Sequence, residues 1–226
     1  MTARKQRPEQ SPRRKILVVD DHAVLREGLV AQINREADLV VCGEAGDARQ
    51  AMGALERLAP DLVLVDITLP GRNGLQLIRD MRALRPGLPV LVLSMHDASL
   101  FAERVLRAGG RGYISKQRSG RRLIAAIRHV LSGQIYLSDE MSTRLLDSLS
   151  GKRPARTVSP IEQLTDRELE VFTLIGEAKE TKEISSRLGM SAKTVEAHRA
   201  SIKRKLRLKS GPELTRHAVL WVEAIR

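Results

Sequence analysis

The sequence predicts an α/β fold in which a five-stranded, doubly wound parallel sheet is followed by a small all-α domain. Residues 15–132 alternate between short apolar runs and stretches whose apolar residues recur every three or four positions, a pattern typical of βα units. Only 2% of the residues are aromatic, so the core must be built from Val, Leu, Ile and Ala, which suits helices packed on a parallel sheet. From residue 164 onward, only helical periodicity remains.

The five expected strands are short, predominantly apolar runs. They read KILVVD (15–20), LVVCGEA (39–45), DLVLVD (61–66), PVLVLS (89–94) and GYIS (112–115). Strands of this kind are buried on both faces, and right-handed crossovers then give a parallel sheet between two layers of helices. Ligands of such sheets bind at the carboxyl ends of the strands.

The second half of the chain carries helix start and stop signals. Residues 131–150 can hold a short extra helix, and residues 151–163, rich in Pro, Arg and Ser, read as a linker. Thr165 and Glu168 have the form of a capping box, so a helix should start at Asp166. Gly189 should end a short helix over 182–188, and Ser191 should cap a helix running to about residue 206. The tight connection between these two helices predicts a helix-turn-helix, and Pro212 starts a last amphipathic helix.

Composition sets the class of protein and its partners. The expected organisation is a disordered basic arm (1–14), a sheet domain (15–135), a short helix with a linker (136–163) and a helical domain (164–226). The net charge of +12 points to an anionic partner, either nucleic acid or a membrane surface. The single cysteine, Cys42, allows no intrachain disulfide, and no apolar run approaches the ~18 residues of a spanning helix. We expect a cytoplasmic protein.

Three carboxylates, a hydroxyl and an amine should meet at one edge of the sheet. Asp20 and Asp21 end the first strand, Asp66 ends the third, Ser94 ends the fourth, and Lys116 follows the fifth. An aspartate at a strand end is often only a turn residue, but three such carboxylates repel one another and call for a cation. Oxygen ligands favour Mg²⁺, and a screened Asp66 carboxylate can attack a phosphoryl group.

The segments VVDDH, LVLVDITLPGRNG, VLVLSMHD and GYISK resemble the receiver domain of two-component response regulators, which has a flavodoxin-like fold. This resemblance implies that Asp66 accepts phosphate from a histidine kinase. It also implies that Asp21, Asp66 and the main-chain carbonyl of Thr68 bind Mg²⁺, and that Asp20 holds a metal-bound water. Ser94 and Tyr113 would then be a switch pair, and Lys116 would contact the phosphoryl group; Tyr113 can also be read as a packed aromatic.

The helix expected from Ala192 to Arg207 is basic on one side. Seven Lys or Arg stand against one acid from Lys193 to Lys209, and Val195, Ile202 and Leu206 should face the core. Such a helix after a tight turn suits the DNA major groove. Residues 164–210 resemble the LuxR-type helix-turn-helix, and its pairing with a receiver resembles the NarL/FixJ response regulators.

The resemblance also implies which residues contact double-stranded DNA. Those expected at base edges are Glu196, Ala197 and Ala200. Those expected at the backbone or along the basic face are Lys182, Lys193, Thr194, His198, Arg199, Lys203, Arg204 and Lys205. Ala178 and Thr181 replace the Gly and Asn usually seen before the first helix of the motif.

The resulting hypothesis is a transcriptional regulator, not an enzyme, that acts as a homodimer when phosphorylated and does not bind membranes. The last helix, with Leu214, Ala218, Trp221 and Val222, is expected to join two DNA-binding domains. Two alternatives stay open at this point. One is a Mg²⁺-dependent phosphohydrolase with Asp66 as its nucleophile, and the other is a phosphate sink that signals only through proteins.

Overall fold

The computed structural model describes residues 12–70, 74–94, 98–116, 120–149 and 160–224. Most of the expected basic arm and residues 150–159 of the expected linker lie outside these ranges. The sheet has five parallel strands in the order β2-β1-β3-β4-β5, as the apolar runs predicted. Their bounds are β1 Arg14–Val19, β2 Leu39–Ala45, β3 Leu62–Val65, β4 Val90–Ser94 and β5 Gly112–Ser115.

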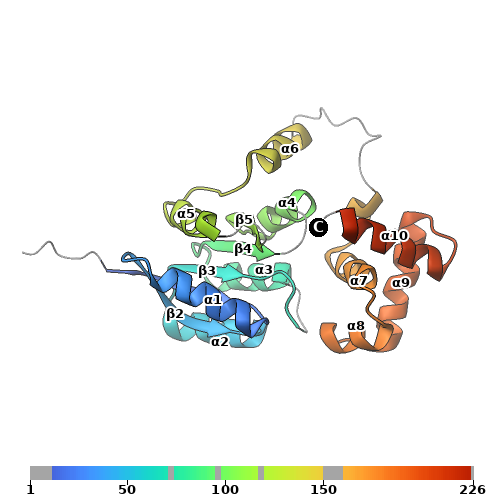
Figure 1. Cartoon of the computed structure of the whole chain (residues 1–226), viewed down its shortest axis with the longest axis horizontal. Coiled ribbons are helices and arrows are strands. Elements are labelled where there is room, and N and C mark those ends of the chain that lie inside the picture. The colour runs from blue at the N-terminus through green and yellow to red at the C-terminus, as the bar shows by residue number, and fades with distance from the viewer. Residues whose placement is uncertain (1–11, 71–73, 95–97, 117–119, 150–159, 225–226) are drawn as a thin grey trace, which may run out of the picture.

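Helices cover both faces of the sheet (Figure 1). One face carries α1 (Ala23–Asn34) and α5 (Gly120–Leu131), and the other carries α2 (Ala48–Leu58), α3 (Gly74–Leu84) and α4 (Ala98–Ala108). Side chains of a strand alternate between faces, so Ile16 and Val18 join the core under α1 and α5, whereas Leu17 and Val19 join the core under the other three helices. Strands β3 and β4 are buried along their whole length, which explains why their sequences lack polar alternation, whereas the edge strand β2 is only partly buried.

The rest of the described chain is helical. Helix α6 (Asp139–Leu149) packs on α4 and buries Met141, so the short extra helix is confirmed. After a 3₁₀ turn at Pro160–Gln163 come α7 (Asp166–Gly176), α8 (Thr181–Leu188), α9 (Ala192–Leu206) and α10 (Gly211–Ala224). The expected caps are present: Thr165 and Glu168 form a capping box, Gly189 is left-handed after α8, and the Ser191 side chain accepts from the Thr194 N–H.

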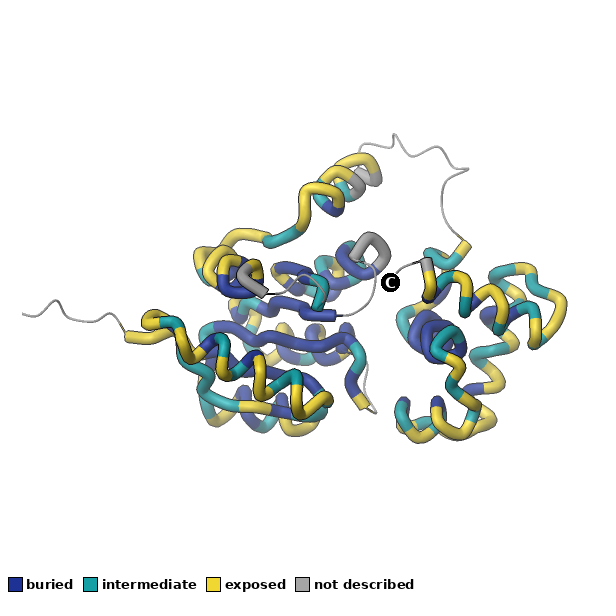
Figure 2. The backbone as a smooth tube through the Cα atoms, viewed as in Figure 1, coloured by how far each residue is buried: buried dark blue, intermediate teal, exposed yellow. Residues whose placement is uncertain are grey.

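Helix α7 is the centre of the helical domain, with every residue from 168 to 175 buried (Figure 2). Helix α10 crosses it closely, because a Cβ on Gly176 would lie only 2.4 Å from the Ala218 carbonyl oxygen. Leu214, Ala218 and Val222 are all at most 5% exposed in this contact. These three residues are used inside one domain, whereas Leu220 of the same helix is 54% exposed, so the role of α10 in joining two domains stays a prediction.

The two domains touch through ion pairs at the start of α7. The Asp166 carboxylate accepts from Arg104 of α4 at 2.8 Å and from Arg79 of α3 at 2.9 Å. Arg104 also donates to the main-chain carbonyls of Leu164 (2.7 Å) and Glu162 (3.3 Å). Only 15% of the Arg104 side chain is exposed, and its guanidinium binds three acceptors of the helical domain.

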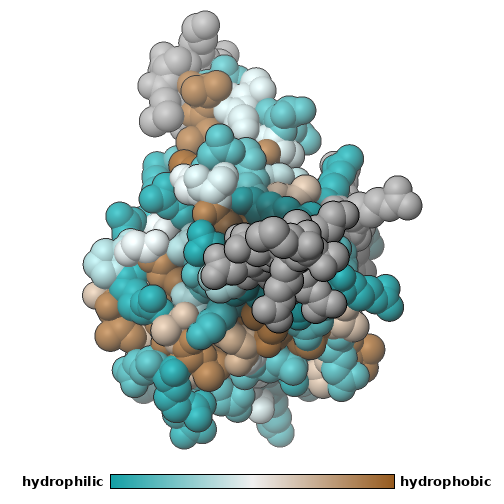
Figure 3. Space-filling view, turned by 90° about the vertical axis from the view of Figure 1, so that its left-hand side faces the viewer, coloured by the Kyte–Doolittle hydropathy of each residue, from teal (hydrophilic) through white to brown (hydrophobic). Residues whose placement is uncertain are grey.

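Large apolar side chains on the surface are scattered. Val24, Leu84, Ile135, Leu146 and Leu220 are exposed, each on a separate element or loop. On the face seen in Figure 3, hydrophobic residues are likewise interspersed with hydrophilic ones. Within the described ranges, none of the helices combines the length and the apolarity that crossing a bilayer requires.

Candidate functional site

The carboxyl edge of the sheet gathers the predicted acids around one lysine. Backbone bonds fix the acids: the Asp66 N–H donates to Val19 O at 2.8 Å, and the Asp20 N–H donates to Ala45 O at 3.0 Å. Asp20 and Asp66 are 1% and 3% exposed. The Lys116 ammonium lies 2.7 Å from a carboxylate oxygen of each. The convergence expected from the strand ends is therefore present.

Burial and charge act against each other in this pocket. Burial raises the pKa of the Asp66 carboxyl to about 6, although the Lys116 ammonium opposes this rise. Burial alone would lower the pKa of Lys116, but the carboxylates of Asp66 and Asp20 outweigh it and raise that pKa. At neutral pH the lysine is charged and Asp66 is ionised, which is the state that a nucleophilic carboxylate needs.

The acids have an arrangement that fits a divalent cation. The Asp21 Oδ1 atom is buried and makes no hydrogen bond to the described residues, although His22 Nδ1 lies 2.8 Å from it. Ligand atoms of Asp20, Asp21, His22 and Asp66 all lie within 4.8 Å of one another. Three clustered carboxylates form a hard oxygen site of the kind that Mg²⁺ prefers.

His22 is the member of this cluster that the sequence did not predict. It stands at the N-cap of α1, but its side chain makes no cap bond. Instead, its Nδ1 atom lies 2.8 Å from Asp21 Oδ1 and 3.3 Å from Asp20 Oδ1. Thr68, whose main-chain carbonyl is an expected Mg²⁺ ligand, donates its backbone N–H to Asp66 Oδ1 at 3.2 Å. The main chain of Thr68 therefore adjoins the site.

The predicted switch residues are both core residues. Ser94 ends β4 and is fully buried, and Tyr113 in β5 is 1% exposed. Tyr113 pairs in register with Val92, and Ser94 pairs with Ser115, so the two predicted switch residues lie on neighbouring strands. Their burial agrees with packing as well as with a switch, and the switch stays a prediction.

Helix α9 presents the predicted nucleic-acid face to solvent (Figure 2). Val195 and Ile202 are fully buried on its inner side. The predicted residues Lys193, Thr194, Glu196, Ala197, Ala200 and Arg204 are exposed, and His198, Arg199 and Lys203 are half-buried. Burial lowers the pKa of His198, so this side chain is neutral at pH 7. Lys182 lies on α8 and is exposed.

Lys205 differs from the other predicted contacts because its ammonium is held inside the domain. It donates to Glu168 Oε2 at 2.5 Å and to Gln163 O at 3.2 Å. Glu168 Oε1 accepts from the Ser201 hydroxyl at 2.7 Å. Burial would raise the pKa of Glu168, but Lys205, Ser201 and the Thr165 cap together lower it to about 2. The sequence predicted Glu168 only as a cap, since its partners on α9 lie 33 and 37 residues away.

Comparison with known proteins identifies both halves of the chain. Residues 16–128 match the response regulator receiver domain family, and residues 162–218 match the bacterial regulatory proteins of the luxR family. The chain belongs to the LuxR-type response regulators. The sheet domain is a receiver and the helical domain is a LuxR-type DNA-binding domain, the pairing of transcription regulators in two-component systems. The resemblance of the sequence motifs to a receiver domain and a LuxR-type helix-turn-helix is confirmed.

Relatives and solved structures agree with this response regulator assignment. Oxygen regulatory protein NreC of Staphylococcus aureus is 37% identical over 209 residues, which cover 91% of this chain and 96% of NreC. RcsB of Salmonella enterica serovar Typhimurium, solved bound to the promoter rprA with a phosphomimetic, has a TM-score of 0.65 at 23% identity, covering 92% of this chain and 98% of RcsB. A LuxR-family response regulator from Aurantimonas has a TM-score of 0.57 at 32% identity, covering 61% of this chain and 99% of its own.

Proposed function

We propose that this response regulator is a cytoplasmic transcription factor, without enzymatic turnover of its own, whose DNA binding is set by phosphorylation of Asp66. The observation that carries this proposal is the Lys116 ammonium at 2.7 Å from Asp66, at the same edge as the clustered carboxylates of Asp20 and Asp21. The phosphate donor is a histidine kinase, in keeping with the receiver family. A phosphate sink that signals only through proteins would leave the basic helix without a role. The LuxR-type domain, which binds DNA through this helix, therefore argues against that alternative.

Phosphoryl transfer needs only a few groups of this chain. An Asp66 carboxylate oxygen forms the new bond to phosphorus while the bond from phosphorus to the donor histidine nitrogen breaks. Lys116 lies where it can bind the phosphoryl oxygens that gain charge. Asp21, Asp66 and the Thr68 carbonyl would hold Mg²⁺ directly, and Asp20 would hold it through water. The ion would screen the incoming phosphoryl group from these carboxylates.

Double-stranded DNA would be bound by the exposed face of α9. Glu196, Ala197 and Ala200 would lie at base edges in the major groove, and the lysines and arginines around them would bind phosphates. Lys205 contributes least, because its ammonium is already paired with Glu168.

The active form would be a homodimer. RcsB has been solved as dimers on DNA, which supports the same assembly for this chain. The residues of α10 that pack on α7 are buried, so a dimer contact through α10 would use its outer side, where Leu220 is exposed.

The test is binding of the full chain to genomic fragments, with and without acetyl phosphate and Mg²⁺. We expect a defined set of fragments to be enriched, with a higher affinity and a two-to-one stoichiometry after phosphorylation. Equal binding of both forms by wild type would contradict phosphorylation control, and a failure to enrich any fragment would contradict DNA recognition.

A further inference from the structure

The Glu196 carboxylate is held by one of its two oxygens. The Thr181 hydroxyl donates to Glu196 Oε1 at 2.9 Å, and Arg199 Nε lies 3.6 Å from the same atom. Within the described part of the chain, no contact engages Oε2. The side chain is nevertheless 60% exposed. One oxygen is therefore bound to the domain, and the other is left to face a ligand.

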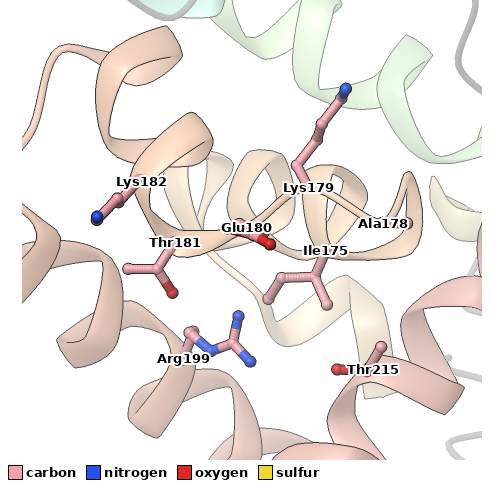
Figure 4. Close-up of a pocket in the computed structure, with 8 residues that line it drawn as sticks. All are labelled: Ile175, Ala178, Lys179, Glu180, Thr181, Lys182, Arg199 and Thr215. Atoms are coloured by element: carbon pink, nitrogen blue, oxygen red, sulfur yellow. The ribbon is translucent and has the colours of Figure 1, made fainter.

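The two groups that hold this carboxylate come from different helices. Thr181 is the first residue of α8, and Arg199 lies three residues after Glu196 on α9. Both line a cavity of about 560 Å³ between α7, α8, α9 and α10. Figure 4 shows their side chains close together, while Lys182 and Lys179 point away from them. Only 20% of the Arg199 side chain is exposed, compared with 60% of the Glu196 side chain.

We propose that Thr181 is a positioning residue that sets the base preference of Glu196. The inference rests on the proposed role of Glu196 at base edges. A free glutamate has many rotamers, and fixing one of them costs conformational entropy when the base binds. The hydroxyl fixes the rotamer in advance and leaves Oε2 to accept from the exocyclic amino group of cytosine, the base donor that carboxylates recognise in the major groove.

The expected size of the effect follows from a single hydrogen bond. One such bond contributes a free energy that corresponds to about a three- to tenfold change in binding. Loss of the hydroxyl should therefore weaken discrimination at one base pair by about that factor. Contacts to phosphates do not depend on the Glu196 rotamer, so affinity for random DNA should stay the same.

The experiment uses the full chain and a pool of duplexes with a randomised core. Wild type, Thr181→Val, Thr181→Ser and Glu196→Ala are selected in parallel with acetyl phosphate and Mg²⁺. Affinities are then measured for duplexes that differ only at the base pair assigned to Glu196, and for one random duplex over a salt series. Val keeps the shape of Thr and removes the hydroxyl, and Ser restores it. Fluorescence of Trp221, in the same domain, checks that each variant is folded.

We expect Glu196→Ala to abolish the preference for cytosine at one position, Thr181→Val to reduce it three- to tenfold, and Thr181→Ser to retain it. If Glu196→Ala changes the preference but Thr181→Val does not, the positioning role is overturned and the role of Glu196 stands. If Glu196→Ala leaves every preference unchanged, the base-reading role fails and the inference fails with it. An equal loss by Thr181→Val on cognate and random DNA would show a backbone or folding role and would also overturn the inference.

Discussion

Removing the charge of Glu168 should destabilise the DNA-binding domain in a pH-dependent way. Its carboxylate is 4% exposed and binds Lys205, Ser201 and the cap of α7. The difference between the ordinary pKa of 4.5 and the value of about 2 in the fold corresponds to about 3 kcal/mol. Glu168→Gln keeps the shape and loses this contribution, so we expect it to cost about 3 kcal/mol at neutral pH.

The sign follows from the depressed pKa. Stability from Glu168 is complete above the unfolded pKa of 4.5 and is lost as the pH falls toward 2. The difference between wild type and Glu168→Gln should therefore shrink from about 3 kcal/mol at about pH 6 to roughly half of that at about pH 3. Other carboxyl groups titrate in both proteins and cancel in the difference.

Trp221 makes the measurement specific to this domain. It is the only tryptophan of the chain, and its ring lies 5.5 Å from that of Phe172. Urea unfolding followed by its fluorescence reports the α7–α10 packing and not the receiver. The matched control is Glu223→Gln, which changes an exposed glutamate of α10 and should leave stability unchanged at both pH values. A gap between wild type and Glu168→Gln that is absent, or that stays constant between the two pH values, would refute the argument.

Three further substitutions test other parts of the structure. Asp21→Asn should weaken Mg²⁺ binding by about tenfold or more in calorimetry, because it removes the charge of one of the three clustered carboxylates; unchanged affinity would exclude Asp21 as a ligand. Ala178→Gly should raise the urea stability of the helical domain by about 0.5–1 kcal/mol, since Ala178 has a φ of +59°, whereas Ala200→Gly within α9 should lower it by about 1 kcal/mol. Arg104→Ala should increase the radius of gyration in small-angle scattering by releasing the helical domain; Arg107→Ala, whose ion pair to Glu103 stays within α4, should not, and equal radii for both variants would contradict docking through Asp166.

Local signals accounted for most of the fold. The strands were predicted because burial on both faces makes their whole sequence apolar, and the caps at Thr165, Gly189 and Ser191 were predicted because their chemistry depends on neighbours only a few residues away. Ala178 stands where the LuxR-type motif usually has glycine. The structure gives the reason for that glycine, because the backbone of Ala178 is in the left-handed region, which favours glycine.

Long-range partners could not be predicted in the same way. The acids of the receiver were found because parallel strands bring their carboxyl ends to one edge. No such rule pairs Glu168 with Lys205, or Thr181 with Glu196, since these contacts depend on how two helices cross. For the same reason, the sequence does not show that Leu214, Ala218 and Val222 of α10 pack on α7.

The first turn of α7 joins the receiver to the DNA-binding helix. Asp166 binds Arg104 of α4, and two residues later Glu168 binds Lys205 of α9. Residues in one helical turn share a backbone, so movement of Asp166 with α4 also moves the carboxylate that holds α9. The free-energy effects of Arg104→Ala and Glu168→Gln on DNA binding should therefore be non-additive, because they act on two ends of one contiguous contact path. Two independent contacts would give additive effects, and the domains would then be linked only by their connecting chain.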